Sequence, residues 1–217
     1  MGASSSFHPI WLSLWVATGA LFLCFPLGVL AAHGVRRAPR VWQFLLEAVF
    51  LLPLVLPPVV SGLVLLLALG KNAPLGRAGF ELLFTPWAAI LAAAFVAFPL
   101  VYSGAKSAFE SVSPELELAA QSVGASPTRV FWTISLPLGW PILAGGALLA
   151  FARGLGEFGA TVMVAGNIEG QTLTAPVAIY LAAEDGNFAL ATRYAAILAT
   201  LNFVFLLFVR LLGRRAR

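Results

Sequence analysis

The chain has 217 residues, of which 60% are hydrophobic and only 10% are charged, and its mean hydropathy is +0.94. Ordinary soluble domains are about one quarter charged, so these few charges cannot cover a water-exposed surface. The composition therefore excludes a soluble globular enzyme, a disordered protein and a nucleic-acid-binding module. The net charge of +4 comes from arginines clustered between apolar runs, which is typical of an integral membrane protein. The single cysteine, Cys24, excludes an internal disulfide.

Long uncharged runs predict the membrane-spanning helices, because about 20 apolar residues are needed to cross the hydrocarbon core of a bilayer. We predict an all-α polytopic membrane protein in which residues 1–217 form one domain. The five predicted spans are residues 10–32, 48–70, 82–105, 137–165 and 194–212. Residues 170–183 are also uncharged but are too short for a span, so they predict either a surface helix or a re-entrant helix.

The basic residues predict the orientation of these spans, since cytoplasmic segments carry an excess of lysine and arginine. With an external N-terminus and a cytoplasmic C-terminus, the basic residues on the outside are Lys71, Arg77 and Arg193. Those on the inside are Arg36, Arg37, Arg40, Lys106, Arg129, Arg210, Arg214, Arg215 and Arg217. A sixth span would place one of the two arginine clusters outside, so five spans are favoured.

Three prolines interrupt the second predicted span, at Pro53, Pro57 and Pro58. A proline inside a helix removes a backbone hydrogen bond and bends the helix. In lipid, the freed carbonyl groups must face protein or a water-filled cavity. Ser61 and Gly62 follow one turn later. The segment therefore predicts either a bent helix that lines and gates a transport pathway or a bend that serves packing alone.

Residues 113–137, between the third and fourth spans, predict two short cytoplasmic helices. Ser113 is a favourable N-cap, Pro114 is a favourable first residue, and Gly124 suits the C-terminal end. One face of the first helix has the spacing i, i+3, i+4 and i+7, formed by Leu116, Ala119, Ala120 and Val123.

The second short helix is expected to begin at Pro127 and to end at Leu136 and Pro137, before the fourth span. The small side chains of Ala119 and Ala120 would let the first helix enter a groove on another protein. The alternative is an interfacial helix that only caps the bundle.

Two rows of small residues lie along the fourth predicted span: Gly146, Ala150 and Gly154, and then Ala152, Gly156 and Ala160. Small residues at this spacing allow close helix contact in membranes, which predicts a helix buried on two sides, near the axis of a dimer. Arg153 and Glu157 are four residues apart and can pair. Because ionisable groups inside a span are costly, the pair predicts either a contact with a transported anion or a tether at the outer end.

The loop between the third and fourth spans resembles the EAA loop of bacterial ABC-importer permeases. The matching residues are Glu117, Ala119, Ala120, Gly124, Ile134, Leu136 and Pro137. Leu118 stands between Glu117 and the two alanines, whereas the commonest form of the motif has glutamate directly before them. Segments 52–62, 151–161 and 166–180 resemble those of the permeases for molybdate, and sulfate and tungstate permeases share parts of them.

The resemblance implies the permease subunit of an ATP-driven importer in the bacterial inner membrane, with molybdate as the expected anion and sulfate or tungstate as alternatives. It implies that the EAA-type residues contact an ATPase and that Pro57, Pro58, Ser61, Gly62, Arg153 and Glu157 are candidates for the pathway or gate. The implied partners are a second permease copy, two ATPase subunits and a periplasmic or lipid-anchored oxyanion-binding protein.

The sequence has no Walker A motif and no convincing catalytic constellation. We therefore expect no cofactor on this chain and assign ATP and Mg²⁺ to the partner ATPase. His8 and His33 stand alone without metal-ligand spacing, so no metal site is predicted. The remaining alternatives are a passive channel and a membrane-embedded enzyme or assembly factor without a transport role.

Overall fold

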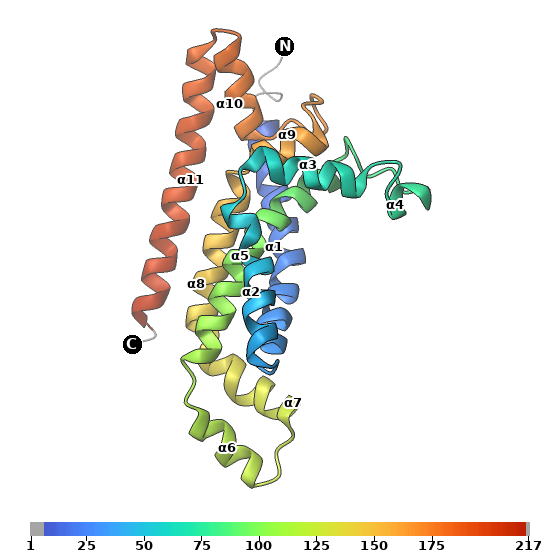
Figure 1. Cartoon of the computed structure of the whole chain (residues 1–217). Coiled ribbons are helices and arrows are strands. Elements are labelled where there is room, and N and C mark those ends of the chain that lie inside the picture. The colour runs from blue at the N-terminus through green and yellow to red at the C-terminus, as the bar shows by residue number, and fades with distance from the viewer. Residues whose placement is uncertain (1–6, 216–217) are drawn as a thin grey trace.

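Figure 1 shows the computed structural model, which describes residues 7–215, with only the backbone from residue 209 onward. Every regular element in this part of the chain is helical. The predicted external N-terminal tail falls mainly on residues 1–6, outside the described residues.

The helices follow one another with short connections. Their bounds are α1 His8–Val35, α2 Arg40–Val55, α3 Pro58–Leu69, α4 Pro74–Arg77, α5 Pro86–Glu110, α6 Pro114–Ser122, α7 Pro127–Val130, the π-helical segment η1 Phe131–Ser135, α8 Leu136–Leu155, α9 Gly159–Ala165, α10 Ala175–Glu184 and α11 Phe188–Arg215.

Four helical segments are long and apolar enough to cross a membrane, and a fifth crossing results if the bent pair α2 and α3 is counted as one. The four are α1, α5, α11 and the continuous helix Pro127–Leu155 formed by α7, η1 and α8. The first turns of α1 and α11 lie at the same end of the bundle, where Ile10 and Tyr194 share one apolar cluster. The α6 end lies opposite (Figure 1), and we call it the inner end because the sequence predicts that it is cytoplasmic.

The second predicted span, residues 48–70, is broken rather than continuous. Helix α2 ends at Val55, and α3 leaves it at an angle of 112°. Leu56 and Pro57 both have extended backbone, because each precedes a proline and that position disfavours the helical conformation. Pro53, whose preceding residue is already helical, stays inside α2. The expected bend is therefore a full break that turns α3 across the outer end of the bundle (Figure 1).

The fourth span begins and ends earlier than residues 137–165. Pro137 does not end the short helix, because η1 shifts the hydrogen-bond register: the Leu136 N–H donates to the Phe131 carbonyl, five residues back. This wider turn accommodates the missing N–H of the proline. The helix ends at Leu155 with Gly156 as its cap. Residues beyond it form the separate helix α9.

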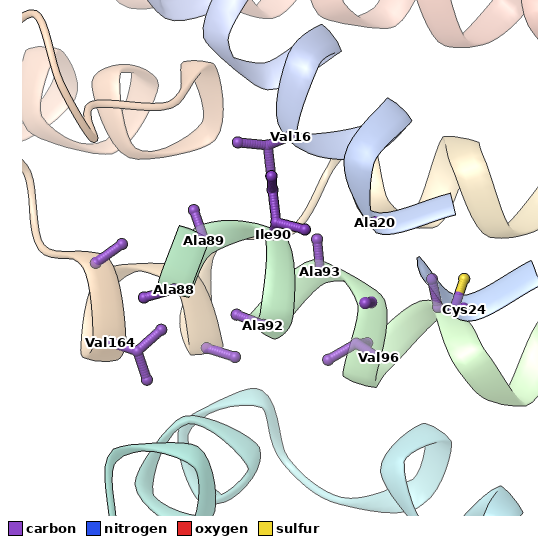
Figure 2. Packing of buried hydrophobic residues seen from close by; sticks show 14 of the residues in the cluster. Val16, Ala20, Cys24, Ala88, Ala89, Ile90, Ala92, Ala93, Val96 and Val164 are labelled. Atoms are coloured by element: carbon purple, nitrogen blue, oxygen red, sulfur yellow. The ribbon is translucent and has the colours of Figure 1, made fainter. Parts of the chain in front are cut away.

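Helix α5 lies at the centre of the bundle and packs against both α1 and α8. It is lined with alanines on all sides, as expected for a fully buried helix. Figure 2 shows part of this cluster, including Val16, Ala20, Ala88, Ala89, Ala92, Ala93 and Val164. Gly104 of α5 and Gly146 of α8 approach so closely that a Cβ on either would lie 2.8 Å from the Cα of the other.

Only one of the two predicted small-residue rows on α8 is buried. Gly146, Ala150 and Gly154 face the interior. The second row is interrupted, since Gly156 is exposed beyond the end of α8. Burial of α8 on two sides, near the axis of a dimer, involves a second copy of the chain and stays a prediction.

The stretch 170–183 contains α10, a short helix that does not cross the bundle. It packs against α11 and the first turns of α1, with Ala175 and Ala178 in their shared apolar cluster. The Ala175 N–H donates to the Ser13 hydroxyl at 2.8 Å, which fixes α10 to α1. The helix thus lies at the outer end, packed on the spans.

Candidate functional site

Helix α6 is formed by the local signals that the sequence predicts. The Ser113 hydroxyl accepts a hydrogen bond from the Glu115 N–H at 3.3 Å. Gly124 follows the helix with a φ of +90°, which a residue with a side chain rarely adopts. The Ser126 hydroxyl accepts from the Arg129 N–H at 3.3 Å and starts the next helix. The predicted caps are confirmed.

No residue of α6 is buried. The helix lies beyond the inner end of the bundle (Figure 1). Leu116, Leu118 and Val123 are at least half exposed, Val123 to 86%, and Ala119 is exposed beside them. A helix of nine residues is only marginally stable by itself. An apolar surface that no other part of the chain covers is typical of an interaction site. We call Leu116, Ala119, Ala120 and Val123 the docking face.

Glu117, one of the motif residues expected to couple the chain to an ATPase, contacts its own chain. Its carboxylate accepts a hydrogen bond from the Ser135 hydroxyl at 2.7 Å and forms an ion pair with Arg36. Burial raises the pKa of the Glu117 carboxyl, but the hydrogen bonds from Ser135 and Arg36 and the charge of Arg36 outweigh it and hold the pKa below its ordinary value. Glu117 therefore binds its own chain as a carboxylate.

The other motif residues are divided between two surroundings. Ala119, Ala120 and Gly124 belong to α6 and its end. Leu136 packs against the apolar cluster at the inner end of the bundle, Ile134 is partly buried beside it, and Pro137 is exposed. The structure thus separates residues that contact the bundle from residues free to contact a partner.

Two inner-end residues have roles that the sequence reasoning missed. In the sequence, Arg36 stands out only as a basic residue of the first loop, and Ser135 carries no local signal. Arg36 is 81 positions from Glu117 in sequence, so no local pattern could join them. Lys106 of α5 and Glu47 of α2 likewise form an ion pair, with 2.6 Å between Lys106 Nζ and Glu47 Oε1.

At the outer end, the candidate gate residues of the second span meet α9. A Cβ on Gly159 would lie 2.6 Å from the Pro58 Cβ, and one on Gly62 would lie 2.8 Å from Met163 and 3.1 Å from the Ala160 Cα. The absence of side chains is therefore what allows α3 and α9 to touch. Pro57 is exposed at the break itself.

Ser61 is fully buried, and its hydroxyl has no hydrogen-bond partner among the described residues. Buried polar groups without partners are uncommon. This position is therefore compatible with both predicted roles of the segment, in packing and in gating.

Arg153 and Glu157 form the predicted ion pair, with 2.7 Å between Arg153 Nη1 and Glu157 Oε2. They do not share one helix, since Glu157 follows the end of α8. Its carboxylate also accepts from the Ala160 N–H at 2.9 Å, at the start of α9. The Glu157 side chain is 2% exposed and that of Arg153 is 33% exposed. Glu157 thus holds both the guanidinium and the turn between α8 and α9.

The exposed part of Arg153 lies on the side of α8 that also carries Ile142 and Leu149, which are 42% and 46% exposed. Residues spaced by four and seven positions share a helix face. Through Glu157 and Ala160, this cationic side of α8 is connected to the contact between α3 and α9. A chain of contacts therefore runs from Arg153 through Glu157 and Ala160 to Gly62.

A long bundle of apolar helices indicates a multi-pass membrane protein, and comparison with known proteins gives its class. Residues 25–217 match the family described as binding-protein-dependent transport system inner membrane component, and the chain belongs to this family. It is a multi-pass permease subunit of an ABC transporter in the cytoplasmic membrane.

Relatives within this class are named for particular anions. The chain is 43% identical over 215 residues to the putative molybdenum transport system permease protein YvgM of Bacillus subtilis (97% of this chain and 95% of the relative). It is 41% identical over 212 residues to the molybdenum transport system permease protein ModB of Escherichia coli K12 (95% and 93%). It is 34% identical over 210 residues to the probable sulfate transport system permease protein cysT of Chlorokybus atmophyticus (93% and 73%).

Solved structures share the fold at low sequence identity. A chain of the methionine ABC transporter MetNI, in inward-facing conformations, superposes with a TM-score of 0.78 at 16% identity over 100% of both chains. A chain of a bacterial ABC transporter for import of the polysaccharide alginate gives 0.79 at 18% identity, over 99% of this chain and 80% of that chain. At these identities the likeness shows the fold alone.

Proposed function

We propose that this chain is the permease subunit of an ATP-driven importer that moves molybdate into the cytoplasm. The observation that carries the proposal is identity above 40% along nearly the whole chain to permeases named for molybdenum transport. The sulfate-named relative is less similar, at 34%, which favours molybdate over sulfate.

In this proposal the docking face of α6 seats in a groove of an ATPase subunit, which binds ATP and Mg²⁺. Its exposed apolar residues and small alanines support this role, because a groove that accepts a helix excludes water from apolar contacts. Two copies of the permease would engage two ATPase subunits.

The pathway would form between two copies of the chain, along the side of α8 that carries Arg153. A partly exposed guanidinium attracts an oxyanion, while its pairing with Glu157 weakens that attraction. A transported ion must leave as well as enter, so a weak contact suits transport. The break at Pro57 and the α3–α9 contact, with Ser61 and Gly62, would then act as the outer gate.

A periplasmic or lipid-anchored binding protein would deliver the anion at the outer end. ATP and the loaded binding protein would each favour one conformation, and each can shift the equilibrium only by its difference in affinity for the two states. This is alternating access across the gate.

The test is anion uptake by the complex of permease, ATPase and binding protein in proteoliposomes. We expect ATP-dependent uptake of molybdate that unlabelled tungstate inhibits more strongly than unlabelled sulfate. Uptake of sulfate in preference to molybdate would assign the chain to the sulfate importers. Uptake that is independent of ATP would indicate a passive channel and would contradict the proposal.

A further inference from the structure

Glu117 is the one side chain that joins α6 to the bundle by polar contacts within residues 7–215. The other side-chain hydrogen bonds of α6 stay within the helix or its cap, such as Ser122 to the Leu118 carbonyl at 2.9 Å. Since α6 buries no residue, its position relative to the spans depends on this carboxylate, on its two covalent connections and on its contacts with α7 and η1.

The ion-pair partner of Glu117 lies where three helices end. Arg36 directly follows α1, and its Nη1 approaches the Phe109 carbonyl of α5 at 3.5 Å. Gln43 of α2 donates from its side-chain amide to the Arg36 carbonyl at 3.3 Å and to the Ala38 carbonyl at 2.9 Å. A displacement of Arg36 therefore acts on the inner ends of α1, α2 and α5.

The second partner of Glu117 connects it to the fourth span. Ser135 is the last residue of η1 and directly precedes α8. Pi-helical turns are rare and occur frequently at functional sites. Here the turn places a buried Ser135 hydroxyl within reach of the Glu117 carboxylate. One side chain thus contacts segments that lead into four helices.

The covalent connections of α6 lead only to α5 and α7. The pair of Glu117 with Arg36 adds a route to α1 and α2, and α2 continues to the break before α3. The Glu117 side chain is 12% exposed and that of Arg36 34%. The carboxylate is thus shielded from water while Arg36 is exposed, so the strength of the pair lies between that of a buried and that of a surface ion pair.

We propose that Arg36, Glu117 and Ser135 form a latch that transmits the displacement of α6 to α1 and α2 during transport. Glu117 and Arg36 are then positioning residues for coupling, and Glu117 does not bind the ATPase. The proposal rests on the proposed docking of an ATPase on α6. It explains why a carboxylate on a helix that buries no residue points back into its own chain.

The first test measures anion uptake per ATP hydrolysed by the reconstituted complex, with molybdate as the probe. Glu117→Gln and Arg36→Gln should each lower this ratio by about 2- to 30-fold, the range for residues that change coupling without touching either ligand. The ATPase should still co-purify with both variants. Combining Arg36→Glu with Glu117→Arg should restore the ratio above that of either reversal alone. Glu115→Gln, which removes a charge from the same helix without touching the latch, is the matched control and should leave the ratio unchanged.

A second test is independent of the anion. Spin labels at Val41 of α2 and at Gln121, on the face of α6 away from the docking face, both exposed, are introduced into a Cys24→Ala background. With an intact latch, addition of ATP should leave the distance between these labels nearly constant, and Glu117→Gln should let it change.

Several outcomes would overturn the latch: unchanged uptake per ATP in both glutamine variants, no recovery in the charge-reversed pair, or equal label distances with and without Glu117→Gln. Loss of the ATPase from Glu117→Gln but not from Arg36→Gln would also overturn it, because Glu117 would then be a docking contact. Failure of molybdate uptake by the unmodified complex would instead count against the proposed function, and the label distances would still decide the latch.

Discussion

The membrane-embedded bundle and helix α6 are held together by opposite means. In the bundle, α5 and α8 touch where Gly104 meets Gly146, and α3 and α9 touch where Gly62 meets Ala160. Helix α6 buries no residue and is fixed by a carboxylate that binds Arg36 and Ser135. Close packing tolerates no added atom, whereas an ion pair can lengthen and re-form. The spans are therefore expected to be rigid, whereas the position of α6 can adjust.

The largest effect that separates the two regions is expected at the docking face. Ala120→Glu would carry an unpaired charge into the groove of the ATPase, and an uncompensated buried charge costs about 3–5 kcal/mol. We expect the ATPase to be lost from the purified complex while the thermal stability of the permease alone is unchanged. Gln121→Glu adds the same charge on another face of α6 and should retain the ATPase. Loss of permease stability in Ala120→Glu would show that α6 packs as part of the bundle.

The next effect tests the packing of the bundle. Gly146→Ala places a Cβ 2.8 Å from the backbone of Gly104, so α5 and α8 must separate, and overpacking costs about 1–3 kcal/mol. Its neighbour Gly145 faces open space, and Gly145→Ala should be neutral or stabilising by about 0.5–1 kcal/mol, since alanine favours a helix. Thermal unfolding of the two purified variants in detergent measures these changes in stability. Equal melting temperatures would refute the close contact as a determinant of stability.

A smaller and more selective effect is expected where a polar pair occurs inside the bundle. Arg153→Met removes the partly exposed cation near the outer end of α8, and local positive fields raise the rate of anion entry by about tenfold or more. Molybdate uptake at low concentration should fall on the order of tenfold. Arg153→Lys, which keeps the charge, should reduce molybdate uptake less than Arg153→Met does. If the lysine variant is as impaired as the methionine variant, the pair is a structural tether.

The smallest effect concerns pH at the inner end. Because the folded pKa of Glu117 is below its ordinary value, the stabilisation by its pair is complete above the ordinary pKa of about 4.3. It is lost as the pH falls through the lower, folded value. Arg36 and His33 are the charged or titratable groups that act on it. The distance between labels at Val41 and Gln121 should therefore stay constant from about pH 8 to about pH 5. A change within this range would contradict the assignment.

Elements set by local chemistry could be predicted from the sequence. The long apolar runs located the crossings, and Ser113, Pro114 and Gly124 located α6, because capping depends on neighbouring residues alone. The pairing of Arg153 with Glu157 also followed from their spacing.

The effect of each proline could not be predicted, because it depends on whether the hydrogen-bond register can shift nearby. Pro57 and Pro58 break the second span, while Pro137 is accommodated by η1 in a continuous helix. The latch was missed for a different reason. Its two charges lie 81 positions apart, and only the folded chain brings the first loop against α6.

The continuous helix Pro127–Leu155 has 29 residues, which at about 1.5 Å per residue is a rod of roughly 43 Å. This exceeds the roughly 30 Å hydrocarbon core of a bilayer, so a single rod begins beside the docking helix and ends at Arg153. Within this rod, the π-helical turn η1 and Pro141 are the places where the helix can bend. Beyond it the chain changes direction at Gly156, immediately before the carboxylate that holds α9.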